Sequence, residues 1–405
     1  MKHLLSFFSM AMLFVFTACG SEEHEETPFS GTAKRTMIVY MSGENNLSTF
    51  VTRDTAEMIA GSKNLTDCYY IAFIDKAESG QNPSIWKFEK GKSTRVRQYD
   101  EDFYSSDPER MHEVLSWIIS QYPAKSYALT LWGHANAWVI EKDTVKVAEN
   151  SNLRRAYGRD SGNDTSSGGK WMNIPTLASV LKHLNARFDY IFCDCCNMAN
   201  AETAYELRNL TDYLIASPAE IPAQGAPYNT ISQSFFADNM TSVCQGIVDG
   251  YYQSVGGQLP LAVIKMSEME QLANATRVIL QTMAPTKEKE LDLNGLMYYD
   301  GERKNLLRSL YDMNDFLLQN APANDYGQWK QALDKAVIYK KNANGWVSNG
   351  HVNFNDFTST DEKYGGMSMY IPRTFYDLYA YSDNYNSTYN KMQWYWTVGW
   401  NSYGW

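Results

Sequence analysis

Short apolar segments alternate with amphipathic helical patterns along most of this chain. The apolar segments are rich in β-branched and aromatic residues and span 35–41, 68–74, 127–132, 190–192, 213–216 and 261–266. Apolar residues recur at helical spacing between them, at 50–60, after Pro108, after Pro175 and at 198–207. Buried strands that alternate with helices are typical of an α/β protein, in which helices flank a mostly parallel sheet.

The alternation of apolar strands and helical patterns ends near residue 266. We therefore expect one α/β domain over residues 35–266 and a separate C-terminal region over 267–405. Helical patterns dominate that region to about residue 340, and strand-like and aromatic-rich material follows. The apolar segment at 366–371 could still belong to the main sheet.

The N-terminus has the features of a processing signal. Residues 1–18 combine Lys2 with an apolar stretch that is too short to span a membrane. The stretch closes in Phe-Thr-Ala-Cys19, which resembles the lipobox of bacterial lipoproteins and implies cleavage before Cys19 and acylation of its thiol. Residues 19–34 are predicted to be a flexible acidic tether. We expect a lipid anchor in the bacterial cell envelope, at the outer membrane or cell surface; an ordinary cleaved signal with free secretion stays open.

The overall composition excludes some classes of partner. The formal net charge is −10 and no basic stripe is present, which argues against a nucleic-acid partner. The chain carries 28 Tyr and 11 Trp, a content that suggests aromatic surfaces and contact with carbohydrate.

A cysteine and a histidine each follow one of the predicted strands. Cys196 comes after the strand at 190–192 and before the helical pattern at 198–207, where a helix dipole would favour the thiolate. His134 follows the strand at 127–132. Because the carboxyl ends of parallel strands meet at one edge of a sheet, these positions predict a thiol–imidazole pair suited to nucleophilic catalysis.

The sequence around these two residues resembles the clostripain family of cysteine peptidases, in the caspase-like clan. The run Trp132 to Trp138 is similar to the family's W-x-H-G-x-G-W block, and Asp194 to Met198 is similar to its D-A-C-L-M block. Weaker agreement extends the resemblance to roughly 35–265. It implies a caspase-like sheet and a cysteine endopeptidase that acts on peptide or protein substrates.

The resemblance also implies roles for individual residues. Cys196 would be the nucleophile, His134 the general base and acid, and the backbone amides of Ala135 and Cys196 the oxyanion hole. Ala135 and Ala137 stand where the family has glycine, and alanine fits poorly where φ must be positive. An alternative therefore stays open, namely a catalytically impaired surface lipoprotein that binds peptide or glycan.

Relatives in the family commonly prefer Arg or Lys before the cleaved bond, and several are activated by cleavage. The resemblance places Asp194 in an acidic specificity pocket, with Glu220 on a neighbouring loop as a second contributor. The polar loop between the two blocks offers Arg154 and Arg155 as sites of self-cleavage.

The sequence leaves two kinds of metal site open. Cys193 and Cys195 would share a buried face of the strand, but with Cys196 they could also bind a soft metal. Calcium assists some relatives, and Glu44, Asp160 and Asp164 could contribute ligands. The main expectation is that catalysis needs no cofactor and no metal.

Overall fold

The computed structural model describes residues 32–78, 81–140, 157–162, 169–299, 308–343, 345–348, 351–352, 359–378 and 385–405. Thr32–Trp405 forms one compact unit. The predicted signal peptide with Cys19, the self-cleavage candidates Arg154 and Arg155, and Asp164 lie outside the described residues. Among the helices that are described, none has the length and apolar character needed to cross a membrane.

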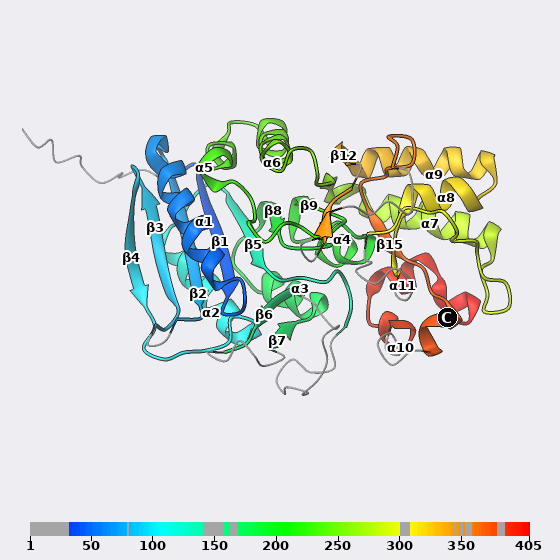
Figure 1. Ribbon diagram of the computed structural model, residues 1–405, viewed down its shortest axis with the longest axis horizontal. Coiled ribbons are helices and arrows are strands. Elements are labelled where there is room, and N and C mark those ends of the chain that lie inside the picture. The colour runs from blue at the N-terminus through cyan, green and yellow to red at the C-terminus, as the bar shows by residue number, and fades with distance from the viewer. Residues whose placement is uncertain are drawn as a thin grey trace, which may run out of the picture. The chain divides into compact units, whose positions relative to one another are not determined.

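A nine-stranded sheet forms the centre of the molecule, in the order β12-β10-β9-β8-β5-β1-β2-β3-β4 (Figure 1). These strands are β1 (Arg35–Gly43), β2 (Cys68–Lys76), β3 (Ser84–Glu89), β4 (Lys92–Gln98), β5 (Tyr127–Gly133), β8 (Phe188–Asp194), β9 (Thr211–Ala216), β10 (Leu261–Lys265) and β12 (Val337–Lys341). The five central strands from β2 to β9 pair in parallel, whereas the outer strands on both sides pair antiparallel. The predicted α/β class with a mostly parallel sheet is confirmed.

All six strands predicted from apolar segments are present. The sequence missed β3, β4 and β12, which lie towards the sheet edges. The side chains of β4 are all exposed or partly exposed, so this strand lacks the continuous apolar run that marks a buried strand.

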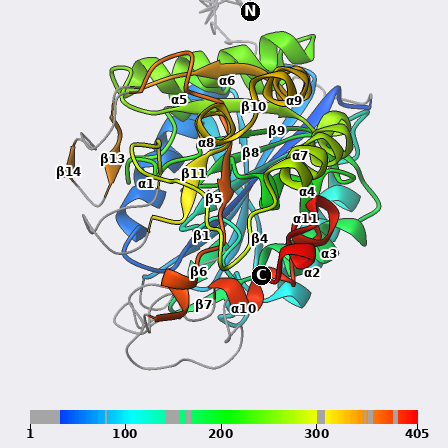
Figure 2. The ribbon, with the colours of Figure 1, turned by 90° about the vertical axis from the view of Figure 1, so that its right-hand side faces the viewer.

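Helices cover both faces of the sheet (Figures 1 and 2). The apolar side chains of α1 (Ser48–Gly61), α5 (Tyr228–Ile231) and α6 (Met240–Ser254) pack in one core cluster. Those of α2 (Pro108–Gln121), α3 (Ile174–Lys182) and α4 (Ala201–Leu207) pack in the other. Asp107 caps α2 by accepting hydrogen bonds from the amides of Glu109 and Arg110, and Pro108 fits the first turn because it needs no donor there.

The helix after Cys196 begins later than its sequence pattern predicted. It starts at Ala201, where the Asn200 side chain accepts a hydrogen bond from the Thr203 amide at 2.8 Å. A turn at residues 196–197 and a short irregular segment precede this helix, so Cys196 does not lie at a helix N-terminus. The predicted stabilisation of its thiolate by a helix dipole is therefore wrong, because that effect fades beyond the first turn.

The C-terminal region contributes a strand to the main sheet and contacts the chain after Cys196. Its described elements are α7 (Met269–Met283), β11 (Leu310–Asp312), α8 (Met313–Asn320), α9 (Ala323–Ala336), β13 (Val347–Ser348), β14 (His351–Val352), β15 (Ser368–Tyr370), α10 (Tyr385–Tyr389) and α11 (Gln393–Val398). Strand β12 joins the main sheet beside β10, whereas β15, in the 366–371 segment, pairs with β11. The Ser368 amide donates to the Ala199 carbonyl at 2.9 Å, so this region also supports the segment after Cys196.

The aromatic side chains mostly fill the interior rather than a surface. Trp138 is buried against Tyr370 and Tyr389, with ring centroids 4.7 and 4.8 Å away. Trp396 is 56% exposed, whereas every other described Trp is buried or half-buried. The aromatic surface expected from composition is therefore not found on the described part of the chain.

The first described residues are already part of the folded unit. Ala33 is fully buried and forms a β-bridge with Ala124. The chain is thus ordered slightly before the predicted end of the tether at residue 34. Two further strands, β6 (Tyr157–Asp160) and β7 (Lys170–Met172), form a small antiparallel pair beside the main sheet.

Candidate active site

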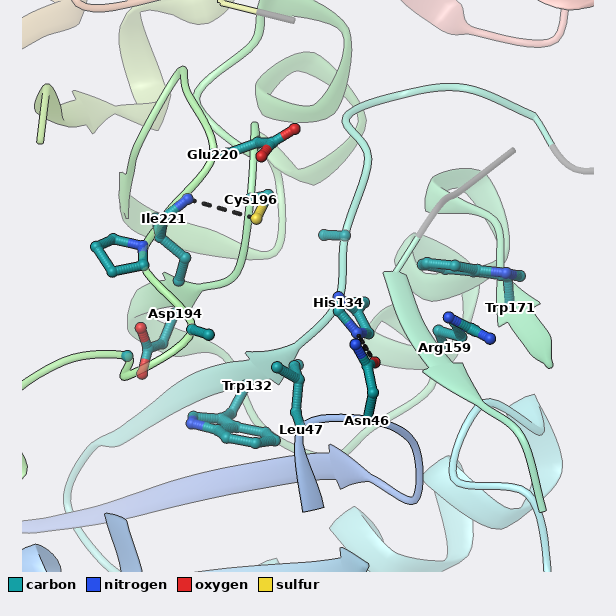
Figure 3. Close-up of a pocket in the computed structure, with 15 residues that line it drawn as sticks. Asn46, Leu47, Trp132, His134, Arg159, Trp171, Asp194, Cys196, Glu220 and Ile221 are labelled. Atoms are coloured by element: carbon teal, nitrogen blue, oxygen red, sulfur yellow. Dashed lines mark hydrogen bonds between the residues drawn. The ribbon is translucent and has the colours of Figure 1, made fainter. Parts of the chain in front are cut away.

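The candidate pair lies at the carboxyl ends of two neighbouring parallel strands. Trp132 of β5 and Asp194 of β8 are register partners, and His134 and Cys196 follow them by the same number of residues. The prediction that two parallel strands bring these residues to one edge of the sheet is therefore met. Figure 3 shows both side chains at the same pocket.

That pocket has a volume of about 290 Å³. It is lined by residues of the two strand ends and of the loops beside them: Asn46, Leu47, Trp132, Gly133, His134, Ala135, Arg159, Trp171, Asp194, Cys196, Glu220, Ile221, Pro222, Ala223 and Gly225. All the described residues that the sequence selected as catalytic, oxyanion or substrate-binding groups are among them.

His134 is held from two sides. Its Nε2 lies 2.7 Å from Oδ1 of Asn46, on the loop after β1 (Figure 3). Its carbonyl accepts a hydrogen bond from the Gly158 amide of β6 at 2.8 Å. With the Asn46 oxygen as acceptor, Nε2 carries a proton and Nδ1 remains for proton exchange. Asn46 carries no role that is predictable from the sequence, because only the fold brings it to the histidine.

Cys196 is half-buried at a sharp turn. Asn197 has φ 59°, a left-handed conformation that asparagine tolerates better than most residues. The Asn197 amide donates to the Ala219 carbonyl at 2.9 Å, and the Ile221 amide donates to Sγ of Cys196 at 3.4 Å. A donor aimed at sulfur favours the thiolate, so the loop after β9 supplies stabilisation that a helix dipole does not.

The two alanines that replace family glycines differ in conformation. Ala135 is not among the residues with positive φ, so its methyl group fits an ordinary backbone. Ala137 has φ 52°, which costs a non-glycine residue about 1–2 kcal/mol. The alanine after the histidine therefore introduces no backbone strain at the pocket, and the strain falls on buried Ala137 two residues later.

Asp194 lies at the buried end of the pocket and is held by several donors. It accepts hydrogen bonds from the Ala226 amide, from the Tyr228 hydroxyl at 2.9 Å and from the Tyr251 hydroxyl at 3.2 Å. Burial raises the pKa of Asp194 to about 6, although these donors oppose the shift. Asp194 is therefore mostly ionised at neutral pH.

A second carboxyl group, Asp54 of α1, lies behind the same part of the pocket. Its Oδ2 accepts a hydrogen bond from Nε1 of Trp132 at 2.7 Å, and its buried Oδ1 has no hydrogen-bond partner. A Cβ atom on Gly225 would lie 2.9 Å from Oδ2 of Asp194 and 3.2 Å from Oδ2 of Asp54. Burial and the charge of Asp194 raise the pKa of Asp54 to about 8. The sequence did not identify Asp54 as a candidate site residue, because no motif in its helix distinguishes it from other polar residues.

The remaining cysteines lie away from the pocket. Cys193 and Cys195 are buried in the core, with relative exposures of 1% and 0%, and all five described cysteines are free thiols. Asp194 and Cys196, which alternate with them along the chain, line the pocket instead. The predicted burial of Cys193 and Cys195 on one face of the strand is therefore present.

A group of acidic residues lies near the loop that carries Asn46. Glu44, Asp75 and Asp102 each offer an oxygen atom, and these atoms lie within 4.8 Å of one another. Among the described residues, this is the only group of three or more potential metal ligands, and it contains no cysteine. The sequence selected Glu44 but missed Asp75 and Asp102.

Comparisons with known proteins agree with one another. A model of the clostripain family matches residues 39–405. Clostripain from Hathewaya histolytica is 24% identical over 226 residues, which cover 49% of this chain and 41% of that protein. The chain thus matches less than half the length of that curated relative.

Two solved structures are similar over nearly the whole chain. A secreted cysteine protease from Bacteroides thetaiotaomicron, in complex with an irreversible peptide inhibitor, is 28% identical with a TM-score of 0.74, and the match covers 91% of this chain and 100% of that one. An inactive zymogen protease from Parabacteroides distasonis is 26% identical with a TM-score of 0.74, and the match covers 91% and 99%.

Proposed function

The chain belongs to the clostripain family of cysteine peptidases, and from that premise we propose that it is an endopeptidase whose catalytic pair is Cys196 and His134. The observation that carries the proposal is the paired register of β5 and β8, which leads both residues to one pocket. The irreversible peptide inhibitor of the Bacteroides protease supports a covalent mechanism in this family.

In the proposed mechanism, Nδ1 of His134 takes the proton of the Cys196 thiol, and Sγ attacks the carbonyl carbon of the scissile bond. The Ile221 amide supports the thiolate before attack, and the amides of Ala135 and Cys196 donate to the oxyanion. His134 delivers a proton to the leaving amine, which departs and leaves a thioester. His134 then takes a proton from water, whose oxygen attacks the thioester and releases Cys196. Asn46 keeps the imidazole oriented through both steps.

The proposed substrates carry Arg or Lys before the cleaved bond. At neutral pH the buried end of the pocket holds an ionised Asp194, while Asp54 retains its proton because its pKa is about 8. The two groups together then carry one negative charge, which matches one basic side chain. Glu220 lines the same pocket and adds an acceptor nearer the thiol.

We also propose activation by self-cleavage at Arg154 or Arg155. These residues come shortly before β6 in the sequence, and the Gly158 amide of β6 donates to the His134 carbonyl, so cleavage there would create a chain end close in sequence to a strand that contacts His134. The inactive zymogen among the similar structures supports such a step. Intact mass of wild type and Cys196→Ala after expression tests it: two fragments from wild type alone are expected, and a single chain from both would refute it.

We propose that the mature protein is anchored by a lipid at Cys19 and lies in the bacterial cell envelope, at the outer membrane or cell surface. The lipobox-like sequence supports the anchor, and the secreted Bacteroides protease supports export. Metabolic labelling with an alkyne fatty acid should tag wild type but not Cys19→Ser. An untagged wild type that is recovered from the medium would instead indicate free secretion.

Covalent labelling separates the peptidase from the alternative binding protein. An acyloxymethyl ketone peptide with a terminal Arg should label wild type at Cys196 and should not label His134→Ala. Iodoacetamide serves as a control for thiol access, since it needs no peptide recognition. A folded protein that iodoacetamide alkylates but that no peptide reagent labels would favour an impaired protein that binds peptide or glycan.

A further inference from the structure

The two sides of the pocket around His134 differ in charge. Asp194 lies on one side of His134 (Figure 3). Arg159 and Trp171 lie on the opposite side and line the same pocket. Arg159 is the only Lys or Arg among the described residues that line it. The proposed mechanism uses the side of Asp194 and gives Arg159 and Trp171 no role.

The direction of a bound peptide follows from the proposed function, on which this inference rests. The basic side chain before the cleaved bond points to Asp194, and His134 gives its proton to the amine that leaves. The peptide chain after the cleaved bond therefore starts at His134 and leads away from Asp194, towards Arg159. An extended peptide advances about 3.3–3.6 Å per residue. The ring centroids of His134 and Trp171 are 6.4 Å apart, so two residues span that distance.

The backbone that carries Arg159 is fixed to the segments around His134. The Gly158 amide donates to the His134 carbonyl at 2.8 Å. The Arg159 carbonyl accepts a hydrogen bond from Nδ2 of Asn45 at 2.6 Å. The register of β6 against β7 shifts within Tyr157–Asp160, and such irregularities often direct a side chain towards an active site. The pocket therefore has a cation whose backbone is positioned together with His134.

The carboxylate that follows Arg159 in the chain belongs to the interior. Asp160 is fully buried and is not among the residues that line the pocket. Its carboxylate accepts hydrogen bonds from the Ser105 hydroxyl at 2.8 Å and from the Gly162 amide at 2.9 Å. Gly169 makes room for the side chain of Arg159, because a Cβ atom there would lie 3.0 Å from Cγ of Arg159. On this side, the charge that lines the pocket is thus positive.

We propose that Arg159 and Trp171 form a subsite for the residues that follow the cleaved bond, and that this subsite selects Asp or Glu at the first or second of them. A guanidinium group is permanently charged and has five donors, so it can bind a carboxylate in addition to its contacts within the protein. Trp171 is 5% exposed and supplies an apolar wall for the methylene groups of the acidic side chain. A preferred substrate then carries a basic residue before the bond and an acidic one after it, and each charge meets its opposite.

Cleavage kinetics of the full mature protein test this selection. Internally quenched peptides carry Arg before the bond and Glu, Gln or Lys at the first or the second position after it. For wild type, kcat/KM should be roughly 5-fold higher with Glu than with Gln at the better position, as expected for a partly exposed ion pair. Arg159→Gln should bring this ratio close to one, and Arg159→Glu should favour Lys. A wild type that cleaves Glu and Gln peptides equally at both positions would overturn the proposal.

Two controls separate recognition from a structural role. Lys170→Gln removes a cation from the neighbouring strand β7, where Nζ lies 3.7 Å from the ring centroid of Tyr104 and outside the pocket lining. This variant should keep the wild-type ratio. A coumarin amide of an Arg peptide has no amino acid after the bond and reports on the rest of the site. If Arg159→Gln lowers kcat/KM equally for the coumarin amide and the Glu peptide, and the Glu-to-Gln ratio stays at its wild-type value, Arg159 is merely structural and the proposal fails.

Peptide binding to Cys196→Ala tests the subsite without catalysis. Fluorescence polarisation should give a Kd for the Glu peptide roughly 5-fold below that for the Gln peptide, and adding Arg159→Gln should remove the difference. Equal affinities, or no binding of either peptide at millimolar concentration, would overturn the subsite. A wild type that cleaves no peptide, beside a Cys196→Ala protein that prefers the Glu peptide, would instead overturn the peptidase function alone, so the two failures are distinguishable.

Discussion

Trp132 and Asp194 face each other as register partners on the neighbouring parallel strands β5 and β8. This pairing carries the candidate nucleophile and base to the same edge of the sheet, two residues further along each strand. The same pairing connects the candidate pair to the proposed specificity pocket, because Trp132 donates to Asp54 while Asp194 lies at the buried end of the pocket. The candidate catalytic residues and the proposed specificity residues are therefore positioned by the same two strands.

Asn46 is expected to orient His134. Asn46→Ala should lower kcat about 10-fold or more with little change in KM, because the imidazole loses the acceptor for its Nε2 proton. Asn46→Asp keeps an acceptor and adds a charge, so it should restore activity and move the His134-dependent limb of the kcat profile to higher pH. Steady-state kinetics over a pH series measures both effects. If alanine and aspartate variants lose activity equally, with unchanged pH profiles, Asn46 is merely structural.

The central strands and the candidate pair were accessible from sequence because local patterns determine them. A buried parallel strand needs a nearly continuous apolar run, and β5 and β8 both show one. Their strand ends then place His134 and Cys196 without knowledge of any other contact. The exposed strand β4 has no such run and was missed.

The residues that complete the site depend on contacts distant in sequence. Asn46 reaches His134 across 88 positions, and Trp132 reaches Asp54 across 78. The Ile221 contact with Cys196 uses a backbone amide, which no residue type reveals. The helix predicted from residue 198 was misplaced because Asn200 caps it and leaves a turn and a short irregular segment before Ala201.

Gly225 is expected to keep the buried end of the pocket open. Gly225→Ala would place a methyl group 2.9 Å from Oδ2 of Asp194, and should raise KM for Arg substrates about 10-fold or more while iodoacetamide still alkylates Cys196. Gly256→Ala is the matched control, since Gly256 has φ 62° against 65° for Gly225 but no described neighbour within 4 Å. Both should lose about 1 kcal/mol of stability from backbone strain. An equal change in KM would show that space at Gly225 is unimportant.

The selectivity for basic substrates should depend on pH through Asp194. Its pKa is about 6, so acidification through that value protonates the carboxylate and removes the charge that attracts Arg. The ratio of kcat/KM for an Arg substrate to that for an uncharged one should fall roughly 10-fold between neutral pH and about pH 5. Because both substrates depend on Cys196 and His134 equally, the protonation of these two residues does not affect the ratio. Asp194→Asn should give a low ratio at every pH, and a ratio that is constant in wild type would contradict the assignment.

Asp54 should make the folded state less stable at alkaline pH. Its folded-state pKa is about 8, whereas an unfolded Asp titrates near ~3.9, so the folded protein binds this proton more tightly. The resulting stability is fully present below the unfolded value and is lost as pH rises towards and through about 8. Asp54→Asn cannot ionise. Its unfolding temperature relative to wild type should therefore be higher at pH 9 than at pH 5, and a difference that does not change with pH would exclude this role.

Ala137 and Ala135 offer a matched test of backbone strain, because both are buried alanines where the family has glycine. Replacement by glycine removes one buried methyl group and adds similar unfolded-state entropy at each position, but only Ala137 has a positive φ, 52°. Ala137→Gly should therefore be more stable than Ala135→Gly by about 1–2 kcal/mol in urea unfolding. Equal stabilities would mean that the turn after His134 tolerates the left-handed alanine without cost.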